Sequence, residues 1–161
     1  MGGVILNVSN TGELAELWQR LLRNMKSTAP DAFVEGVLVE QMCPPGVELI
    51  AGIRNDPQWG PMLLIGFGGV LAHALQDVRP FPAHLDATAI TSEIFSLKCA
   101  PLLQGFRGSP AADVAAAARI VRRLGDLVLS HPEIHEADIN PIVVYQDGQG
   151  AVALDALLSV Q

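Results

Sequence analysis

The dipeptide Asp147-Gly148 lies between two mostly apolar stretches, 137–145 and 150–158. This is a strong short-range signal for a β-hairpin, because aspartate and glycine suit the positive φ angles of a two-residue turn. Such a turn also determines the register of the two strands. With these two residues as the loop, Asn140 lies directly opposite Asp155.

Asp138 lies on the same face of the predicted hairpin as that pair, because side chains alternate along a strand. Two carboxylates and an amide carbonyl are hard oxygen ligands of the kind that Mg²⁺ accepts. A solvated polar face or a simple Asn–Asp hydrogen bond fits the same pattern, and a three-residue loop would shift the register by one. The spacing therefore predicts a candidate magnesium site and leaves these alternatives open.

Further strand-like segments precede the hairpin and are separated by gaps too short for crossover connections. Short gaps favour antiparallel pairing. The composition predicts strands at residues 3–8, 33–42, 47–54, 61–67 and 74–79. This part of the chain therefore forms a mixed, mostly antiparallel sheet.

Three helices are expected beside these strands. The first starts after Asn10, which forms a capping box with Glu13, and ends before Pro30. The second runs from a cap at Asp86 to about residue 98, and the third covers residues 111–130. Ser109 and Pro110 are expected as the N-cap and the first residue of the third helix. We therefore expect an α+β fold with helices flanking the sheet, in a single domain of residues 1–161.

Composition narrows the possible partners. The 161 residues are 50% hydrophobic and carry a net charge of −7, so neither intrinsic disorder nor general nucleic-acid binding is expected. No apolar run reaches the roughly 18 residues that a membrane span needs. We expect a cytoplasmic protein that binds neither nucleic acid nor membranes.

The segments 137–144 and 152–156 resemble two motifs, acidic-Ile-Asn-Pro-Leu and Ala-Leu-Asp-Ala, that close a known domain. This is the ATP-grasp domain of NDP-forming acyl-CoA synthetases, such as ADP-forming acetyl-CoA synthetase and, more distantly, the succinyl-CoA synthetase β subunit. The resemblance implies that Asn140 and Asp155 hold Mg²⁺. It also implies that Asp138 is catalytic and lies close to the phosphate transfer.

Residues 36–42 and 46–61 resemble the hinge strand and the following signature segment of the same family. The resemblance implies nucleotide contacts for Glu40, Met42 and Glu48. Arg54 is a candidate catalytic phosphate ligand, since a guanidinium fork suits oxyanions and the even spacing places it on the face of Glu48. A surface ion pair for Glu48 and Arg54, and a plain core position for Met42, remain alternatives.

The turn at residues 66–69 resembles the Gly-rich turn of the family. The resemblance places Gly68 and Gly69 at the nucleotide, where glycine permits close backbone approach to phosphate. A tight turn between strands is the alternative. The chain departs from the family at His73, where an acidic residue is usual, and at Phe81, where arginine is usual. Arg79 is a candidate substitute for that arginine.

The resemblance implies an enzyme that couples ATP/ADP and Mg²⁺ to acyl-CoA thioester chemistry through a phosphohistidine. CoA is expected to bind other domains or another subunit of the synthetase. The family's smaller subdomain, which supplies a lysine and often the histidine, is expected upstream of the segment Met1-Gly2-Gly3-Val4. The chain is then the larger, C-terminal part of an ATP-grasp domain, inactive alone. A non-catalytic regulatory or interaction module with the same fold is the alternative.

Overall fold

The computed structural model describes residues 2–69 and 76–160. The contacts within the chain divide it into two compact units, Met1–Pro44 and Pro45–Gln161. In the described part of the chain, no helix combines the length and the apolar character needed to cross a membrane.

The first unit contains one helix, α1 (Thr11–Thr28). Its N-cap is Asn10, as predicted, and the Asn10 side chain accepts the backbone N–H of Glu13 at 2.9 Å. The Glu13 carboxylate accepts the N–H of Ser9, one residue before the cap, at 2.8 Å. The first contact satisfies a donor that the start of a helix leaves free, and the second ties the preceding residue to the first turn. The predicted cap is confirmed.

The strands predicted at residues 3–8 and 33–42 are wrong, because the described residues of this unit contain no strand. Both segments are irregular, and Val4 and Phe33 are 78% and 88% exposed. β-branched residues favour an extended backbone, but a strand also needs a neighbour to complete its hydrogen bonds. Among the described residues of the first unit, neither segment has a hydrogen-bonded partner strand.

The second unit is built on a six-stranded sheet in which every strand pair is antiparallel. Its strands are β1 (Val47–Asp56), β2 (Gly60–Phe67), β3 (Val78–Pro82), β4 (Ile134–Val144), β5 (Ala151–Ala153) and β6 (Ala156–Val160). The strand order is β3-β2-β1-β4-β5, and β6 also pairs with β4. The predicted α+β class and the mostly antiparallel sheet are confirmed.

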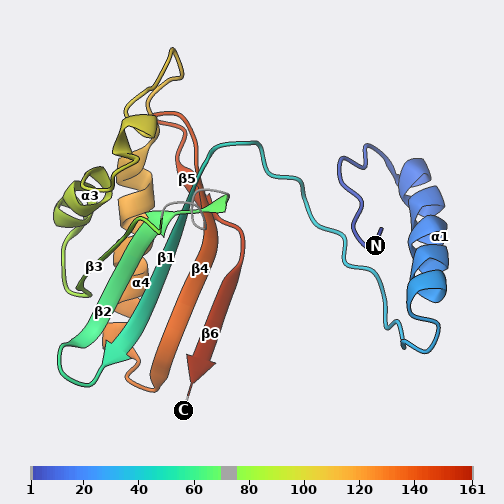
Figure 1. The fold of residues 1–161 in the computed structure, drawn as a ribbon, viewed down its shortest axis with the longest axis horizontal. Helices are drawn as coiled ribbons and strands as arrows, with labels where there is room; N and C mark the ends of the chain where they lie inside the picture. The colour runs from blue at the N-terminus through green and yellow to red at the C-terminus, as the bar shows by residue number, and fades with distance from the viewer. Residues whose placement is uncertain (1, 70–75, 161) are drawn as a thin grey trace. The chain divides into compact units, whose positions relative to one another are not determined.

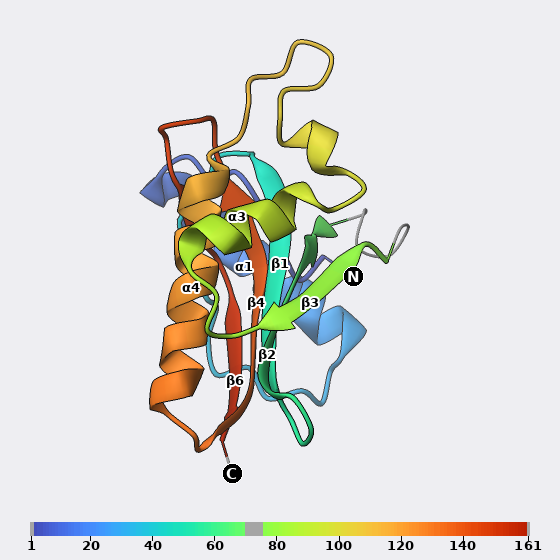
Figure 2. The same ribbon diagram turned by 90° about the vertical axis from the view of Figure 1, so that its left-hand side faces the viewer.

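Helices cover one face of this sheet. They are α3 (Ala87–Phe95) and α4 (Val114–Ser130), with a short 3-10 helix, η1 (Ala100–Leu102), between them. Alternate residues of β1 and β2 point into the core beneath the helices, including Leu49, Ala51, Ile53, Leu63 and Ile65. Figure 1 looks onto the opposite face, with α4 behind the strands, and Figure 2 shows the same helices from the side. We call the side of the sheet opposite α3 and α4 the open face.

The strand predicted at residues 74–79 lies farther along the chain, at β3. Residues 74 and 75 fall outside the described part of the structure. β3 contains prolines at positions 80 and 82, and it is an edge strand paired only with β2. Proline lacks an N–H and is tolerated where one side of a strand has no partner.

The helix expected from Asp86 is confirmed as α3, with the Asp86 side chain accepting the N–H of Ala89. The expected start of the next helix is wrong. Asp113, not Ser109, caps α4, and its carboxylate accepts the N–H groups of Ala116 at 2.9 Å and Gly150 at 3.0 Å. The second contact joins the helix to the β4–β5 turn, so tertiary structure selects the cap.

Asp113→Ala is expected to lower the free energy of unfolding by about 1–2 kcal/mol, because it removes a helix cap and the link to Gly150. Urea denaturation followed by circular dichroism measures the loss. Asp86→Ala, which removes a cap with a single N–H partner, should cost less. Equal losses for the two variants would contradict the linking role of Asp113.

The Asp113 carboxylate should also make the free energy of unfolding depend on pH. The N–H of Ala116, and then that of Gly150, lower the pKa of Asp113. A lowered folded-state pKa stabilises the protein fully above the unfolded value of about 3.9 and loses that effect as the pH falls through the folded value. The stability gap between wild type and Asp113→Ala should therefore narrow in acid, as urea denaturation at a series of pH values would show.

Candidate functional site

The register of the terminal hairpin agrees with the sequence prediction. Tyr145 and Gly150 pair across the two-residue turn, with Tyr145 N–H donating to the Gly150 carbonyl at 3.0 Å. Farther along, the backbone N–H of Asn140 donates to the carbonyl of Asp155 at 3.1 Å. The two residues predicted to face each other are therefore opposed across β4 and the β5–β6 junction.

The sheet is irregular at this point. The pairing of β1 with β4 shifts between Leu49 and Ala51, and β5 ends at Ala153 before β6 starts at Ala156. A β-bulge disrupts the ladder locally and re-aims side chains, and such bulges are common near active sites. Asn140 and Asp155 thus lie at an interruption in the regular sheet, where both are exposed.

Asp138 lies one pair farther along the open face, opposite Gly52 of β1. Its Oδ1 is 3.4 Å from the position that a Cβ on Gly52 would occupy, so the carboxylate lies close over the neighbouring strand. Partial desolvation raises the pKa of Asp138, and the charges of Glu136 and Asp155 raise it further. The electrostatics therefore favour a proton or a cation at this position.

The donor set of Asp138, Asn140 and Asp155 fits a magnesium ion. Within the described residues, none of the three side chains makes a hydrogen bond or an ion pair, so their oxygens are available. No group of three or more His, Cys, Asp or Glu side chains in residues 2–69 and 76–160 could hold a metal ion by itself. Mg²⁺ suits such a sparse site, because it usually retains waters and takes further oxygens from substrate phosphates.

Glu48, Gly68 and Gly69 form a second group at the end of the open face where β1 begins. The Gly68 N–H donates to the Glu48 carbonyl at 2.8 Å. A Cβ on Gly69 would lie 2.7 Å from Glu48 Oε2, and Gly69 has a φ of +58°. The backbone conformation therefore favours glycine at position 69, and an added methyl would displace the Glu48 carboxylate. The structure brings these three predicted residues together.

Arg54 lies on the open face toward the other end of β1, opposite Glu136 of β4. Six residues separate it from Glu48, about 20 Å along a strand. Neither Glu48 nor Arg54 forms an ion pair with a described residue, so the alternative of a surface ion pair has no support. Along β1 the order of groups is thus Glu48, the predicted metal ligands, then Arg54.

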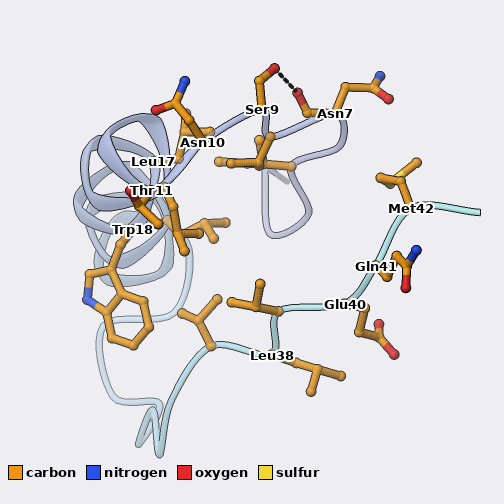
Figure 3. A pocket seen from close by; sticks show the side chains of 16 residues that line it. Asn7, Ser9, Asn10, Thr11, Leu17, Trp18, Leu38, Glu40, Gln41 and Met42 are labelled. Carbon is orange, nitrogen blue, oxygen red and sulfur yellow. Dashed lines mark hydrogen bonds between the residues drawn. The ribbon is translucent and has the colours of Figure 1, made fainter.

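Glu40 and Met42 belong to the first unit. They line a cavity of about 540 Å³, together with residues of α1, Ile5 and residues 7–10. Figure 3 shows Leu17 and Trp18 of α1 across this cavity from the segment that carries Leu38, Glu40 and Met42. Met42 is 48% exposed, which excludes the plain core position that the sequence left open.

The two described departures from the family pattern lie away from the open face. Phe81 is 3% exposed in the core beneath the helices. Arg79 donates from Nε to Glu93 of α3 at 2.6 Å, so its charge is engaged on the helix-covered side. Arg79 is therefore no substitute phosphate ligand. His73 lies outside the described residues.

The sequence analysis did not identify two acidic residues that lie near the site. Glu136 lies opposite Arg54 and raises the pKa of Asp138. Asp56 follows Arg54 on the same face and accepts the N–H groups of Gln58 and Trp59. Spacing of two residues from Asp138 and from Arg54 is the signal that identifies them, since residues i and i+2 share a face.

The second unit has helices on one sheet face and clustered carboxylates on the other, an arrangement that fits a nucleotide-binding domain of the ATP-grasp class. A sequence model of the ATP-grasp domain matches residues 1–160. Trans-feruloyl-CoA synthase FCS1, from an unknown prokaryotic organism, is 43% identical over 99% of this chain. The beta subunit of ADP-forming acetate–CoA ligase I from Pyrococcus furiosus is 38% identical over 96% of it.

Solved structures agree. Dinucleotide forming acetyl-coenzyme A synthetase 1 of Ca. Korarchaeum cryptofilum, with coenzyme A, acetyl-coenzyme A and a phosphorylated phosphohistidine segment, gives a TM-score of 0.87 at 35% identity. That match covers 100% of this chain and 71% of the solved chain. The complex of the same synthetase with coenzyme A and Mg-AMPPCP gives a TM-score of 0.83 at 32% identity, over 99% and 68% of the two chains. The chain belongs to the ATP-grasp domain family, and the similar proteins above are named as CoA synthases, ligases or synthetases.

The lengths of these proteins differ. The chain spans 23% of the feruloyl-CoA synthase and 66% of the acetate–CoA ligase subunit. The relatives therefore contain parts that have no counterpart in these 161 residues.

Asp138→Asn is expected to raise stability at pH 7 in metal-free buffer. The pKa of Asp138 is higher in the folded than in the unfolded protein. The free energy of unfolding therefore falls as the pH rises from the unfolded-state pKa through the folded-state pKa. The uncharged variant avoids this loss, and urea denaturation at pH 4 and pH 7 measures the difference.

Asp155→Asn should in addition lower the pKa of Asp138 in a carboxyl ¹³C NMR titration, because it removes a neighbouring negative charge. Asp147→Asn, which makes the same charge change in the β4–β5 turn, is the matched control and should leave that pKa unchanged. An Asp138 titration identical in all three proteins would contradict the charge cluster.

Proposed function

We propose that this chain is the nucleotide- and Mg²⁺-binding part of an NDP-forming acyl-CoA synthetase. The observation that carries the proposal is the opposed pair Asn140 and Asp155, joined at 3.1 Å through the backbone and adjacent to Asp138 on the open face. The relatives that are named as CoA ligases, and the solved complex with Mg-AMPPCP, support the same assignment.

Each residue has a distinct task in this proposal. Asn140 and Asp155 hold the metal ion, which, when bound, supplies positive charge to the phosphates. Arg54 adds charge-assisted hydrogen bonds to a phosphate group, in the electrostatic manner on which phosphoryl transfer depends. Asp138 orients the group that exchanges the phosphoryl with the nucleotide.

The remaining predicted residues bind the rest of the nucleotide. Glu48 and the backbone of Gly68 and Gly69 contact it at one end of the open face. Glu40 and Met42 contribute contacts from the first unit, in the segment that resembles the hinge of the family.

The complete reaction needs more than this chain. We propose that the remaining domains or a second subunit bind coenzyme A and the acyl group, and supply the histidine that carries the phosphoryl group. This follows the relatives, which are longer, and the solved synthetase with its phosphorylated phosphohistidine segment. We also propose that the protein is located in the cytoplasm.

Calorimetric titration of the chain with Mg·ATP tests the assignment. Wild type is expected to bind, and Asp155→Ala to bind at least tenfold more weakly, which corresponds to about 1.4 kcal/mol. Asp147→Ala removes a carboxylate from the β4–β5 turn and should bind as wild type does. Absence of binding by folded wild type would contradict the proposal and favour the non-catalytic module.

Gly69→Ala tests the other end of the site. The added methyl would lie 2.7 Å from Glu48 Oε2 and displace that carboxylate, so a loss of nucleotide affinity of about tenfold is expected. Gly148→Ala carries the same positive-φ strain, at +78°, with nothing within 4 Å of the new atom. Both variants should lose stability, by about 1–2 kcal/mol, but only Gly69→Ala should lose affinity. Equal affinities would exclude Glu48 from the site.

A further inference from the structure

Gly52 interrupts the layer of side chains on the open face of the sheet. Its strand, β1, lies between β2 and β4 (Figure 1), and Gly52 pairs with Leu64 on one side and Asp138 on the other. Its nearest neighbours on the same face of β1 are Ile50 and Arg54. All four neighbours carry side chains, so the glycine leaves a space among them, which we call the Gly52 gap.

A glycine in the middle of a strand needs a reason, because it costs conformational entropy and offers no side chain to pack. One reason is a backbone conformation that other residues avoid, but the φ of Gly52 lies outside that left-handed region. Another reason is a β-bulge. The bulge between β1 and β4 has its extra residue on β4, and Gly52 lies beyond it in regular pairing. Neither reason explains this glycine.

Close packing is a third reason, and a second glycine of the open face shows what it looks like. A Cβ on Gly66 of β2 would lie 2.7 Å from Val78 Cγ1 and 2.9 Å from the Asp77 carbonyl oxygen, so a side chain there would push its neighbours apart. Among the described residues, a Cβ on Gly52 would meet only Asp138 Oδ1 at 3.4 Å and a backbone carbonyl oxygen at 3.7 Å. These are ordinary contacts. The fold therefore requires glycine at position 66 but not at position 52.

The remaining reason is the close approach of a ligand. Gly52 is half-buried, and both atoms that border its gap are oxygens. Arg54 lies two residues farther along the same face and forms no ion pair with a described residue. A ligand that carries a cation together with oxyanions fits these neighbours, because carboxylate oxygens attract the cation and a guanidinium attracts the oxyanions.

We propose that Gly52 is a specificity-determining residue, which keeps the gap beside Asp138 open for the Mg²⁺-bound phosphates of the nucleotide. This rests on the proposed function, in which the metal ion and the phosphates bind on the open face. Even a methyl group at position 52 would occupy this space and hold the phosphates away from β1. Gly52 thus lowers the stability of the free protein and raises its affinity for the nucleotide, a combination that a purely structural glycine would not show.

Gly52→Ala separates the two effects. The substitution removes the entropic cost of glycine without a clash, so the variant should unfold at the same urea concentration as wild type or at a higher one. Its affinity for Mg·ATP, measured by calorimetry, should fall at least tenfold, because the added methyl fills the gap. A structural glycine would instead lower stability when it is replaced.

Two other glycines provide matched controls. Gly3→Ala places no described atom within 4 Å of the new methyl and should bind Mg·ATP as wild type does. Gly66→Ala should unfold at a lower urea concentration than wild type, because its Cβ collides with β3. Mg·tripolyphosphate, which has no nucleoside, tests the occupant of the gap. In competition with Mg·ATP, it should bind Gly52→Ala at least tenfold more weakly than wild type.

Equal Mg·ATP affinity in wild type and Gly52→Ala would overturn the role of Gly52 and leave the proposed function intact. A loss of stability in Gly52→Ala as large as that in Gly66→Ala would do the same, since the fold would then require the glycine. If Mg·tripolyphosphate failed to compete on wild type, or bound both proteins equally, the phosphates would not occupy the gap and the inference would be wrong. Absence of Mg·ATP binding by folded wild type would overturn both the inference and the proposed function.

Discussion

The antiparallel pairing of β1 with β4 determines on which side of the sheet each functional side chain lies. Alternate residues of β1, such as Leu49 and Ala51, fill the core beneath α3 and α4. The residues between them, Glu48 and Arg54 included, remain on the open face. A shift of one residue in this register would exchange the two sets, so burial of the core and assembly of the site depend on the same hydrogen-bond ladder.

The open face concentrates negative charge where the regular ladder is interrupted. Asp138, Asp155 and Glu136 lie close enough for their charges to raise the pKa of Asp138. Like charges so arranged cost stability in the metal-free protein, and a divalent cation relieves that cost. Under the proposed function, binding of Mg²⁺ and its phosphates offsets this small loss of stability. Arg54 lies beyond this cluster on the open face. It is the one cation among the described residues of β1, and it forms no ion pair with a described residue.

Much of the candidate site follows from local rules. The turn Asp147-Gly148 predicts the register that places Asn140 opposite Asp155, and even spacing predicts that Glu48 and Arg54 share a face. The cap of α1 is equally local. These predictions succeed because a turn, an alternation or a cap involves residues only a few positions apart. Whether these residues bind magnesium and nucleotide remains a prediction.

Sequence alone thus determined the residue types, the turns and the alternation that create one apolar and one polar face. Tertiary structure decided where those local preferences take effect. Asp113 replaced Ser109 as a helix cap because its carboxylate also reaches Gly150, and Arg79 is engaged because α3 presents Glu93 to it. Residues 3–8 and 33–42 have strand-like composition but no paired neighbour within their unit. The physical reason is the same in each case: a hydrogen bond or ion pair needs a partner, and only the folded chain determines which partner is near.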